Sequence, residues 1–219
     1  MLFRAVYQVR ERLKVMTIRL HCGDLPADYK PGPAIAIDTE TLGLNPYRDR
    51  LCVVQISTGN GSADVVQIPR NAPRPDNMLR VLADPEVLKI FHFGRFDLAI
   101  LYQAYGIMPS PVYCTKIASR LTRTYTDRHG LKDLVRELLG TDMSKQQQSS
   151  DWGADTLTQA QLDYAASDVL HLHALKDKLD MMLAREGRTE IAQHCFEFLP
   201  TRALLDLNGW PDTDIFAHS

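Results

Sequence analysis

Three strand-like segments joined by short turns constrain the fold of this chain more than any other feature. They cover residues 34–41, 51–58 and 63–69 and are rich in Val, Ile and other strand-forming residues. The turn sequences "LGLNPYRD" and "GNGS" separate them. Strands joined this closely pair antiparallel, because a parallel pair requires a longer crossover connection. We therefore predict an antiparallel meander of three strands.

Alternating helix and strand patterns follow the meander. Residues 75–85 predict a helix, residues 87–92 a fourth buried strand, and residues 95–106 a second helix. Further helices are predicted over residues 115–121, 131–139, 158–185 and 188–207. Thr158 and Gln161 form a capping box at the start of the longest of these helices. This order of elements predicts a single α/β domain, a mixed sheet flanked by helices.

The expected domain covers residues 16–207, and a shorter segment lies on each side of it. We interpret residues 1–15 as an N-terminal extension, either a surface segment or an artefact of start-site assignment with Met16 as the natural start. Residues 208–219 form a C-terminal tail with three large apolar side chains: Trp210, Ile215 and Phe216. Because apolar groups are unfavourable in water, we expect this tail to dock on a neighbouring subunit or at the rim of its active site.

Composition excludes several classes of protein. An apolar fraction of 45% and a charged fraction of 24% are typical of a folded domain. The net charge of -2 argues against a basic protein that coats long nucleic acids, so any such ligand would be held at a local site. The cysteines have no zinc-site or paired spacing, which predicts free thiols in a cytoplasmic protein. No run of apolar residues is long enough to span a membrane.

The first predicted strand ends in two carboxylates. In "AIAIDTETLGL", Asp38 and Glu40 lie two residues apart and therefore face the same side of the strand. Asp97 falls in the first turn of a predicted helix, and Asp168 lies in a later helix with Tyr164 four residues before it. Each of these residues alone is more often structural, since strand ends are solvated and helix N-termini favour acids. Their combination requires another explanation.

Carboxylates that converge near the end of a sheet repel one another unless cations lie between them. Ligands that are all oxygen suit Mg²⁺ or Mn²⁺ rather than zinc. Two such ions about 4 Å apart form the arrangement that catalyses in-line hydrolysis of phosphodiesters. A tyrosine hydroxyl beside them is suited to orient the attacking water. The residues thus predict a nuclease site with two divalent cations.

The ordered set resembles the DEDD family of 3′→5′ exonucleases, which have a ribonuclease H-like fold. "DTE" is similar to the first motif of that family, "HFGRFD" to the second and "YAASD" to the third. The resemblance covers about residues 18–183 and implies that Asp38, Glu40, Asp97 and Asp168 are the metal ligands. Tyr164 places the chain in the tyrosine subgroup, because the position of the catalytic histidine in the other subgroup is Asp163 here.

Within the tyrosine subgroup, the chain resembles ribonuclease D, and "KQQQSSDWG" is similar to the loop before the third motif in that family. Ribonuclease D proper continues into further helical domains, which this sequence is too short to contain. The compact length, "HFGRFD" and the "WPDTDIFAHS" ending instead resemble the nanoRNase C family, which degrades very short RNAs. That resemblance implies self-association into a homo-octamer.

Several residues are candidates for substrate binding. By resemblance to short-RNA exonucleases, Leu44 separates two bases; alternatively, it packs into the core as a turn residue. Aromatic rings near the second motif can stack on a base, although Phe96 could equally belong to the core. A basic group around Arg123 is either a phosphate-attracting lip or a solvated surface. The full substrate-binding set is Thr41, Leu44, His92, Phe93, Phe96, Gln148, Ser150 and Trp152, and the basic group is Arg120, Arg123, Arg128 and Lys132.

The predicted function is a two-metal-ion 3′→5′ exoribonuclease that hydrolyses dinucleotides and short single-stranded oligoribonucleotides to 5′-mononucleotides. One alternative keeps the chemistry but changes the substrate to structured RNA 3′ ends or to DNA. Another is a catalytically silent nucleic-acid-binding scaffold on the same fold. Binding alone gives no reason for four converging carboxylates and a tyrosine, so the set argues against the scaffold.

Overall fold

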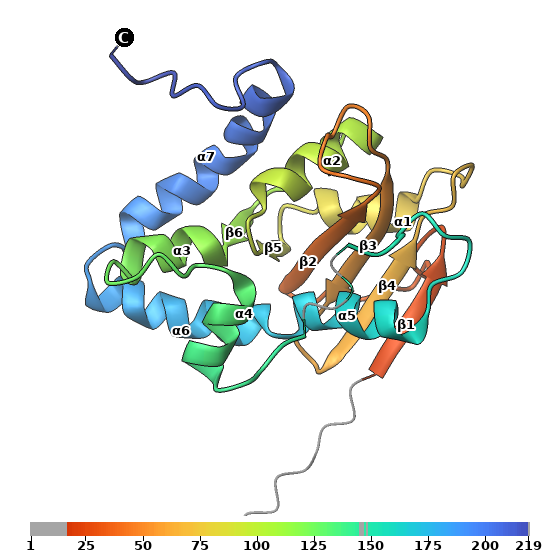
Figure 1. Ribbon diagram of the computed structural model, residues 1–219, viewed down its shortest axis with the longest axis horizontal. Coiled ribbons are helices and arrows are strands. Elements are labelled where there is room, and N and C mark those ends of the chain that lie inside the picture. Colours follow the sequence, from red (N-terminus) through yellow and green to blue (C-terminus); the bar gives the residue numbers. More distant parts are fainter. Residues whose placement is uncertain (1–16, 145–146, 148, 219) are drawn as a thin grey trace, which may run out of the picture.

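The computed structural model describes residues 17–144, 147 and 149–218. In this part of the chain, six strands form one sheet with the order β1-β4-β3-β2-β5-β6 (Figure 1). The strands are β1 (Thr17–Cys22), β2 (Ala34–Thr41), β3 (Leu51–Ser57), β4 (Ser62–Gln67), β5 (Leu88–Phe91) and β6 (Val112–Cys114). Strands β2, β3 and β4 pair antiparallel, whereas β1, β5 and β6 join the sheet in parallel. The predicted meander and mixed sheet are confirmed.

Two strands of the sheet were not predicted. Strand β1 lies at one edge and pairs only with β4, so most of its side chains are at least partly exposed. Strand β6 forms the other edge and has three residues. The β1 segment "TIRLHC" alternates polar and apolar residues, so its sequence contained a strand signal that was missed. Strand β6 is too short for such a pattern to emerge, and pairing with β5 makes it extended.

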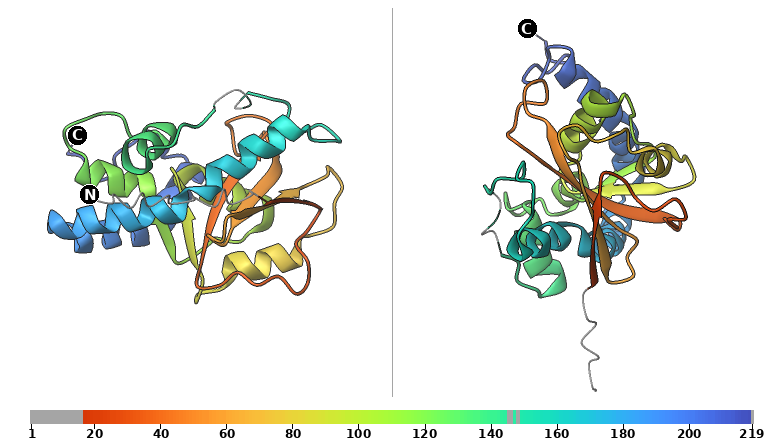
Figure 2. Two further views of the ribbon diagram at one scale, coloured as in Figure 1. Left: turned by 90° about the horizontal axis from the view of Figure 1, so that it is seen from below. Right: turned by 90° about the vertical axis from the view of Figure 1, so that its right-hand side faces the viewer.

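Helices cover both faces of the sheet. They are α1 (Asp76–Ala83), α2 (Arg95–Tyr105), α3 (Thr115–Thr122), α4 (Leu131–Leu134), the π-helical turn η1 (Val135–Leu139), α5 (Gln159–Leu170), α6 (Leu172–Arg185) and α7 (Thr189–Leu207). Helix α5 packs along β2, β3 and β4 on one face, and α1 and α2 lie on the other (Figure 2). Helix α7 packs against α2 and α3. The sheet is thus the middle layer of an α/β/α arrangement.

The prediction of one continuous helix over residues 158–185 was wrong. The structure divides this segment at His171 into α5 and α6. Helix α5 packs on the sheet, whereas α6 packs mainly on α3, so the two halves have different supports. The apolar pattern runs through both halves without a Gly or Pro, so no residue of the kind that ends a helix marks the break. The capping box of Thr158 and Gln161 is present at the start of α5.

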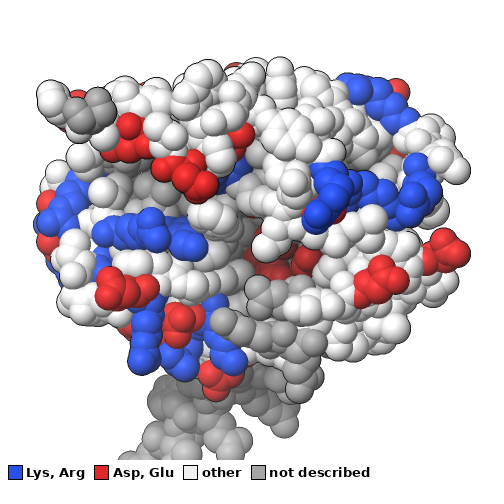
Figure 3. All heavy atoms as spheres, turned by 45° about the horizontal axis from the view of Figure 1, so that its top comes forward, with Lys and Arg blue, Asp and Glu red and all other residues white. Residues whose placement is uncertain are grey.

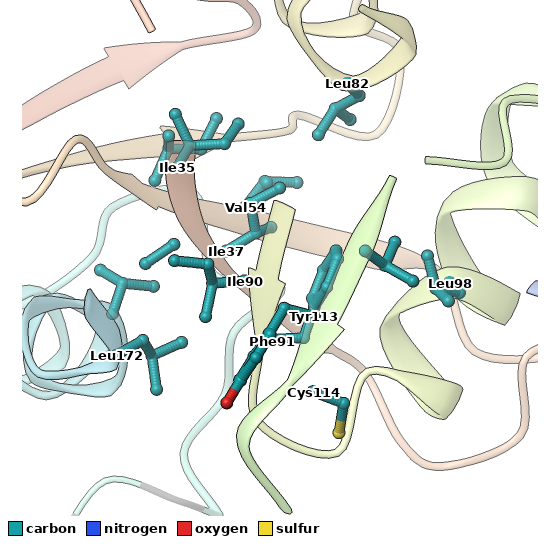
Figure 4. Packing of buried hydrophobic residues seen from close by; sticks show 14 of the residues in the cluster. Ile35, Ile37, Val54, Leu82, Ile90, Phe91, Leu98, Tyr113, Cys114 and Leu172 are labelled. Carbon is teal, nitrogen blue, oxygen red and sulfur yellow. The ribbon is translucent and has the colours of Figure 1, made fainter. Parts of the chain in front are cut away.

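The main core is packed between the sheet and its helices. Ile35 and Ile37 of β2 are fully buried with Val54, Ile90 and Leu98 from neighbouring elements (Figure 4). Removing such side chains from water is the dominant stabilising contribution to folding. The first half of β2 is therefore held firmly, and this determines where the last residues of the strand lie.

The basic group around Arg123 is neither a continuous lip nor a wholly solvated surface. The Arg123 side chain is fully buried and donates hydrogen bonds to the Ser119 hydroxyl, to the Arg128 carbonyl oxygen and to Glu137. Because its charge is satisfied within the fold, it stabilises the loop between α3 and α4. The other three members remain at least partly exposed: Arg120, Arg128 and Lys132.

The extension over residues 1–15 lies outside the described residues. At the C-terminal end, Trp210, Ile215 and Phe216 are exposed, and the Phe216 ring lies 6.0 Å from that of Phe198 on α7.

All four cysteines are free. In the part of the chain that the structure describes, every helix is too short or too polar to cross a membrane.

Candidate active site

Strand β2 presents two carboxylates on one side of its C-terminal end. Asp38 and Glu40 alternate with Thr39, so the two acids face one layer of helices and Thr39 faces the other. The pairing between β2 and β3 becomes irregular between Glu40 and Thr41. Such irregularities are frequent next to active sites, where they end a ladder and redirect side chains. The two acids therefore lie where the sheet gives way to loops.

Helix α2 supplies a third carboxylate, Asp97, from its first turn. A tight connection precedes the helix: Phe93 has a φ of 65°, and Gly94 lies so close to β5 that a Cβ atom there would be 2.7 Å from the Cβ of Phe91. A side chain at Gly94 would therefore force the connection apart. The connection holds the start of α2, with the buried Asp97, against the end of β2.

Helix α5 supplies Tyr164 and Asp168, which lie one helical turn apart and so share a face. Trp152, in the loop before the helix, packs against this face: its ring centroid lies 6.1 Å from that of Tyr164. Only 3% of Trp152 is exposed, and it belongs to a small core cluster with Cys52, Val53, Val65, Leu157 and Ala165. Its position fits support of the Tyr164 ring better than direct contact with a substrate.

Three of the carboxylates converge closely. Asp38, Glu40 and Asp168 each provide an oxygen atom, and these atoms all lie within 4.8 Å of one another. Among the described residues, no Lys, Arg or His forms an ion pair with any of these three acids or with Asp97. A set of oxygen ligands with no protein counter-charge fits hard divalent cations such as Mg²⁺. The donor set therefore passes the chemical test for a metal site.

Burial raises the pKa of each acid in this group, and repulsion between the acids adds to this shift for Asp38, Glu40 and Asp168. Burial is the larger cause for Asp38 and Glu40, and the charges of Asp97 and Asp168 add to it. The pKa values of Asp97 and Asp168 are likewise raised, mainly by burial. Without cations, the carboxyl groups therefore retain protons that would be lost in water. The same causes raise the pKa of the Tyr164 phenol, so it stays neutral at physiological pH.

Two neutral polar side chains contact these acids from within the protein. The Thr39 hydroxyl donates a hydrogen bond to Asp97 Oδ1 at 2.6 Å. The fully buried amide of Gln55, directly opposite Asp38 in the β2–β3 ladder, has Nε2 3.5 Å from Asp38 Oδ2. Sequence reasoning missed both residues. A glutamine in the otherwise apolar segment "LCVVQIS" was the available signal for the second.

An apolar pocket of about 360 Å³ lies at the start of α2. Three predicted substrate-binding residues line it: Leu44, Phe93 and Phe96. Leu44 is 86% exposed, which excludes the alternative that it packs into the core. Sequence reasoning missed the remaining lining residues, which are Asn45, Pro46, Tyr47, Arg95, Ala99, Asp206 and Pro211. Most of them come from a loop and from the C-terminal segment. These two segments are distant in sequence and come together only in the folded structure.

One ion-pair network holds the C-terminal segment at this pocket. Arg95 forms a bidentate pair with Asp206, with distances of 2.5 and 2.6 Å, and also donates to the Pro211 carbonyl oxygen. Arg202 pairs with the same carboxylate and donates to the Trp210 carbonyl oxygen. Charge-assisted bidentate bonds of this kind are geometrically specific. The wall of the pocket formed by Asp206 and Pro211 is therefore fixed to the start of α2.

The other predicted substrate-binding residues lie elsewhere or are engaged locally. His92 Nδ1 lies 2.9 Å from the Thr115 hydroxyl, and burial lowers the pKa of its ring, so it is neutral. Thr41 donates its hydroxyl to the Gly43 carbonyl oxygen. The Ser150 hydroxyl likewise donates to a neighbouring carbonyl group. Gln148 lies outside the described residues.

The surface has a hollow that is visible when the top of the molecule, as drawn in Figure 1, is turned toward the viewer. Acidic atoms lie at the floor of this hollow (Figure 3). Lysine and arginine side chains lie on the surface around it (Figure 3). Positive charge around an acidic floor attracts an anionic ligand to the rim while leaving the floor to cations. This distribution matches a site for a phosphodiester.

A family model described as "3'-5' exonuclease" matches residues 22–184. The chain is 37% identical over 187 residues to ribonuclease D of Granulibacter bethesdensis, covering 83% of this chain and 46% of the relative. It thus spans less than half the length of that curated relative. The chain belongs to the 3′-5′ exonuclease family, within the DEDD superfamily.

Two solved structures are similar over nearly the whole chain. The structure of Brucella melitensis NrnC with bound Mg²⁺ is 62% identical, with a TM-score of 0.89, and the match covers 93% of this chain and 100% of that one. The same protein bound to pGG is 63% identical, with a TM-score of 0.90 and the same coverage. These matches confirm the predicted fold class and the family.

Proposed function

We propose that this protein is a metal-dependent 3′→5′ exoribonuclease that converts dinucleotides and short oligoribonucleotides to 5′-mononucleotides. One observation carries the proposal: one buried and three half-buried carboxylates from β2, α2 and α5 converge, and no described residue of the protein supplies a counter-charge. A fold that buries like charges together is less stable unless a ligand of opposite charge binds there. Family membership connects that ligand to phosphodiester hydrolysis.

The metal ligands would be Asp38, Glu40, Asp97 and Asp168. When bound, two Mg²⁺ or Mn²⁺ ions would supply Lewis acidity that lowers the pKa of the attacking water and stabilises the leaving oxygen. The protein contributes geometry: β2 fixes two acids, while α2 and α5 bring one each from opposite layers. The similar NrnC structure with bound Mg²⁺ supports this assignment.

Tyr164 would orient the attacking water. Its phenol lies one turn from Asp168, and its raised pKa keeps the hydroxyl protonated. It can therefore donate one hydrogen bond and accept another, but it is too weakly acidic to serve as a phenolate base at neutral pH. Support from the Trp152 ring restricts the positions that the Tyr164 ring can adopt.

The pocket at the start of α2 supports a short substrate. Its volume of about 360 Å³ is near the lower end of the range for small-ligand pockets and suits one or two nucleobases. Phe93 and Phe96 offer rings for stacking, and the exposed Leu44 is placed to contact bases. The similar NrnC structure bound to pGG supports a substrate of this size.

The test compares a dinucleotide with a longer single strand, in RNA and in DNA, with Mg²⁺ and with chelator. We expect the RNA dinucleotide to be hydrolysed fastest and chelator to stop all hydrolysis. Equal rates on all lengths would contradict the short-substrate proposal and favour a general trimming exonuclease. Equal rates on DNA would remove the ribose preference, and binding without hydrolysis would favour the scaffold.

Self-association into a homo-octamer is a further part of this proposal. The exposed apolar side chains of the C-terminal tail support an intersubunit contact, because such groups are usually covered. Deleting residues 211–219 and measuring mass by light scattering and length preference by product analysis tests it. We expect smaller particles and a weaker preference for short substrates; unchanged assembly and unchanged preference would contradict the docking role.

A further inference from the structure

We propose that Thr39 is a positioning residue that holds the Asp97 carboxylate in the orientation required for cation binding. The inference rests on the proposed metal-dependent function. Thr39 lies between two predicted metal ligands in sequence, but strand alternation turns its side chain to the opposite side of β2. Nothing in its position requires a direct contact with substrate or cation.

The geometry of the contact is specific. The Thr39 hydroxyl donates to Asp97 Oδ1 over 2.6 Å, and the two residues are separated by 58 positions in sequence. Thr39 is 7% exposed and Asp97 4% exposed, so water has little access to the bond. Hydrogen bonds from hydroxyl groups to carboxylates are short and strong in such surroundings.

Asp97 needs such support more than the other three acids do. Asp38 and Glu40 are adjacent along one strand, and Asp168 provides an oxygen within 4.8 Å of both. Asp97 comes from the other layer and is not a member of this close group. The Thr39 hydroxyl therefore links β2, which carries Asp38 and Glu40, to α2, which carries Asp97.

The bond also determines which oxygen is available. The torsion that rotates a carboxylate has a broad, roughly two-fold profile, so an unsupported Asp97 would sample many orientations. With Oδ1 held by Thr39, we expect Oδ2 to be the oxygen that binds a cation. Ligating carboxylates are commonly held in this way, and loss of the supporting partner typically lowers metal affinity about 10- to 100-fold.

Three substitutions separate positioning from packing. Thr39→Val retains the shape of the side chain and removes the hydroxyl, whereas Thr39→Ser retains the hydroxyl and removes a methyl group. Thr122→Val is a matched control, because Thr122 is also buried and its hydroxyl donates to the Ala118 carbonyl oxygen within α3. Only the first substitution removes a bond to a predicted metal ligand.

The primary measurement is Mn²⁺ binding to metal-free protein without substrate, followed by electron paramagnetic resonance. We expect Thr39→Val to weaken binding about 10- to 100-fold, with Thr39→Ser and Thr122→Val within about threefold of wild type. Wild-type binding by Thr39→Val would overturn the inference. So would a loss in Thr39→Ser as large as that in Thr39→Val, because the methyl group would then be the important part.

A second measurement uses activity against Mn²⁺ concentration. Thr39→Val should shift the activation curve to higher Mn²⁺ and recover most of the rate at saturation, whereas a general packing defect would lower the rate at every concentration. If Thr39→Val unfolds, Thr39→Ala against Thr39→Ser makes the same comparison. If wild-type protein itself binds no Mn²⁺, the proposed function fails rather than the role of Thr39 alone.

Discussion

Two of the regions in which the described chain shields charge from water treat that charge in opposite ways. Around Arg123, a fully buried guanidinium group is surrounded by acceptors: a hydroxyl, a carbonyl oxygen and the carboxylate of Glu137. Around Asp38, one buried and three half-buried carboxylates lie beside one another, and the charges that raise the pKa values of Asp38 and Glu40 are all negative. The first region is complete within the chain, whereas no described Lys, Arg or His pairs with the acids of the second.

The difference separates structural charge from functional charge. A buried charge with a full set of partners fixes one conformation and has no hydrogen-bonding capacity left for a ligand. A buried group of like charges destabilises the fold by itself and gains stability when a counter-ion binds. Substitutions should therefore affect stability in the first region and activity in the second.

The largest expected effect is the loss of hydrolysis in Asp38→Asn. Removing one ligand charge should lower the rate about a thousandfold or more, because the cations supply several kcal/mol of transition-state stabilisation. The fold should persist, since the substitution also removes repulsion from Glu40 and its neighbours. Single-turnover rates and circular dichroism measure the two outcomes. Near wild-type turnover would refute the metal-site assignment.

The converse substitution, Arg123→Met, should affect stability. It leaves the Ser119 hydroxyl, the Arg128 carbonyl oxygen and Glu137 without their shared partner. We expect the free energy of unfolding to fall by about 3 kcal/mol, with activity per folded molecule retained. Urea unfolding measures the first quantity and low-temperature kinetics the second. A stable but inactive variant would reverse the assignment of the two regions.

An intermediate effect concerns pH in the presence of chelator. The pKa of Asp97 is raised to about 7 and that of Glu40 to about 9, so the folded state binds these protons more tightly than the unfolded chain does. Stability from these groups is present at low pH and is lost as pH rises through the folded-state values. We expect Tm to fall by several degrees between about pH 6 and about pH 9.

Three controls sharpen this pH prediction. Added Mg²⁺ should restore Tm, and its effect should grow with pH, because cations bind the ionised carboxylates. Asp97→Asn should have a shallower pH dependence, whereas Arg123→Met should keep the wild-type slope at a lower Tm. A slope unchanged in Asp97→Asn would show that other groups cause the pH dependence.

The smallest expected effect is that of Glu137→Gln. The carboxylate of Glu137 is 41% exposed, so solvent already screens its pair with Arg123. The amide keeps an acceptor for Arg123 and removes only the charge, and we expect a loss of less than about 1 kcal/mol. Urea unfolding beside Arg123→Met measures the difference. A loss as large as that of Arg123→Met would mean that the charge of Glu137 dominates the region.

Local pattern predicted much of this molecule. The strands and turns of the meander follow from β-branched runs, and Asp38 with Glu40 at a strand end predicted an acidic site. The start of α5 followed from its capping box. These features depend on neighbours within a few residues, so the sequence contains them directly.

Features that depend on tertiary contacts could not be predicted in this way. Strand β6 is extended because it pairs with β5, and the break at His171 reflects different supports for α5 and α6. The burial of Arg123 requires the α3–α4 loop to fold around it. The pocket wall at Asp206 requires a pair with Arg95, separated from it by 111 positions.

The central claim is that the carboxylates around Asp38 form a cation site, and calorimetric titration of metal-free protein with Mn²⁺ tests it most directly. The acids retain protons without metal, so binding should release protons near neutral pH. The observed heat should then differ between two buffers of unlike ionisation enthalpy, and Asp38→Asn should bind much more weakly. Absence of binding, equal heats in both buffers or equal affinity of Asp38→Asn would contradict the account.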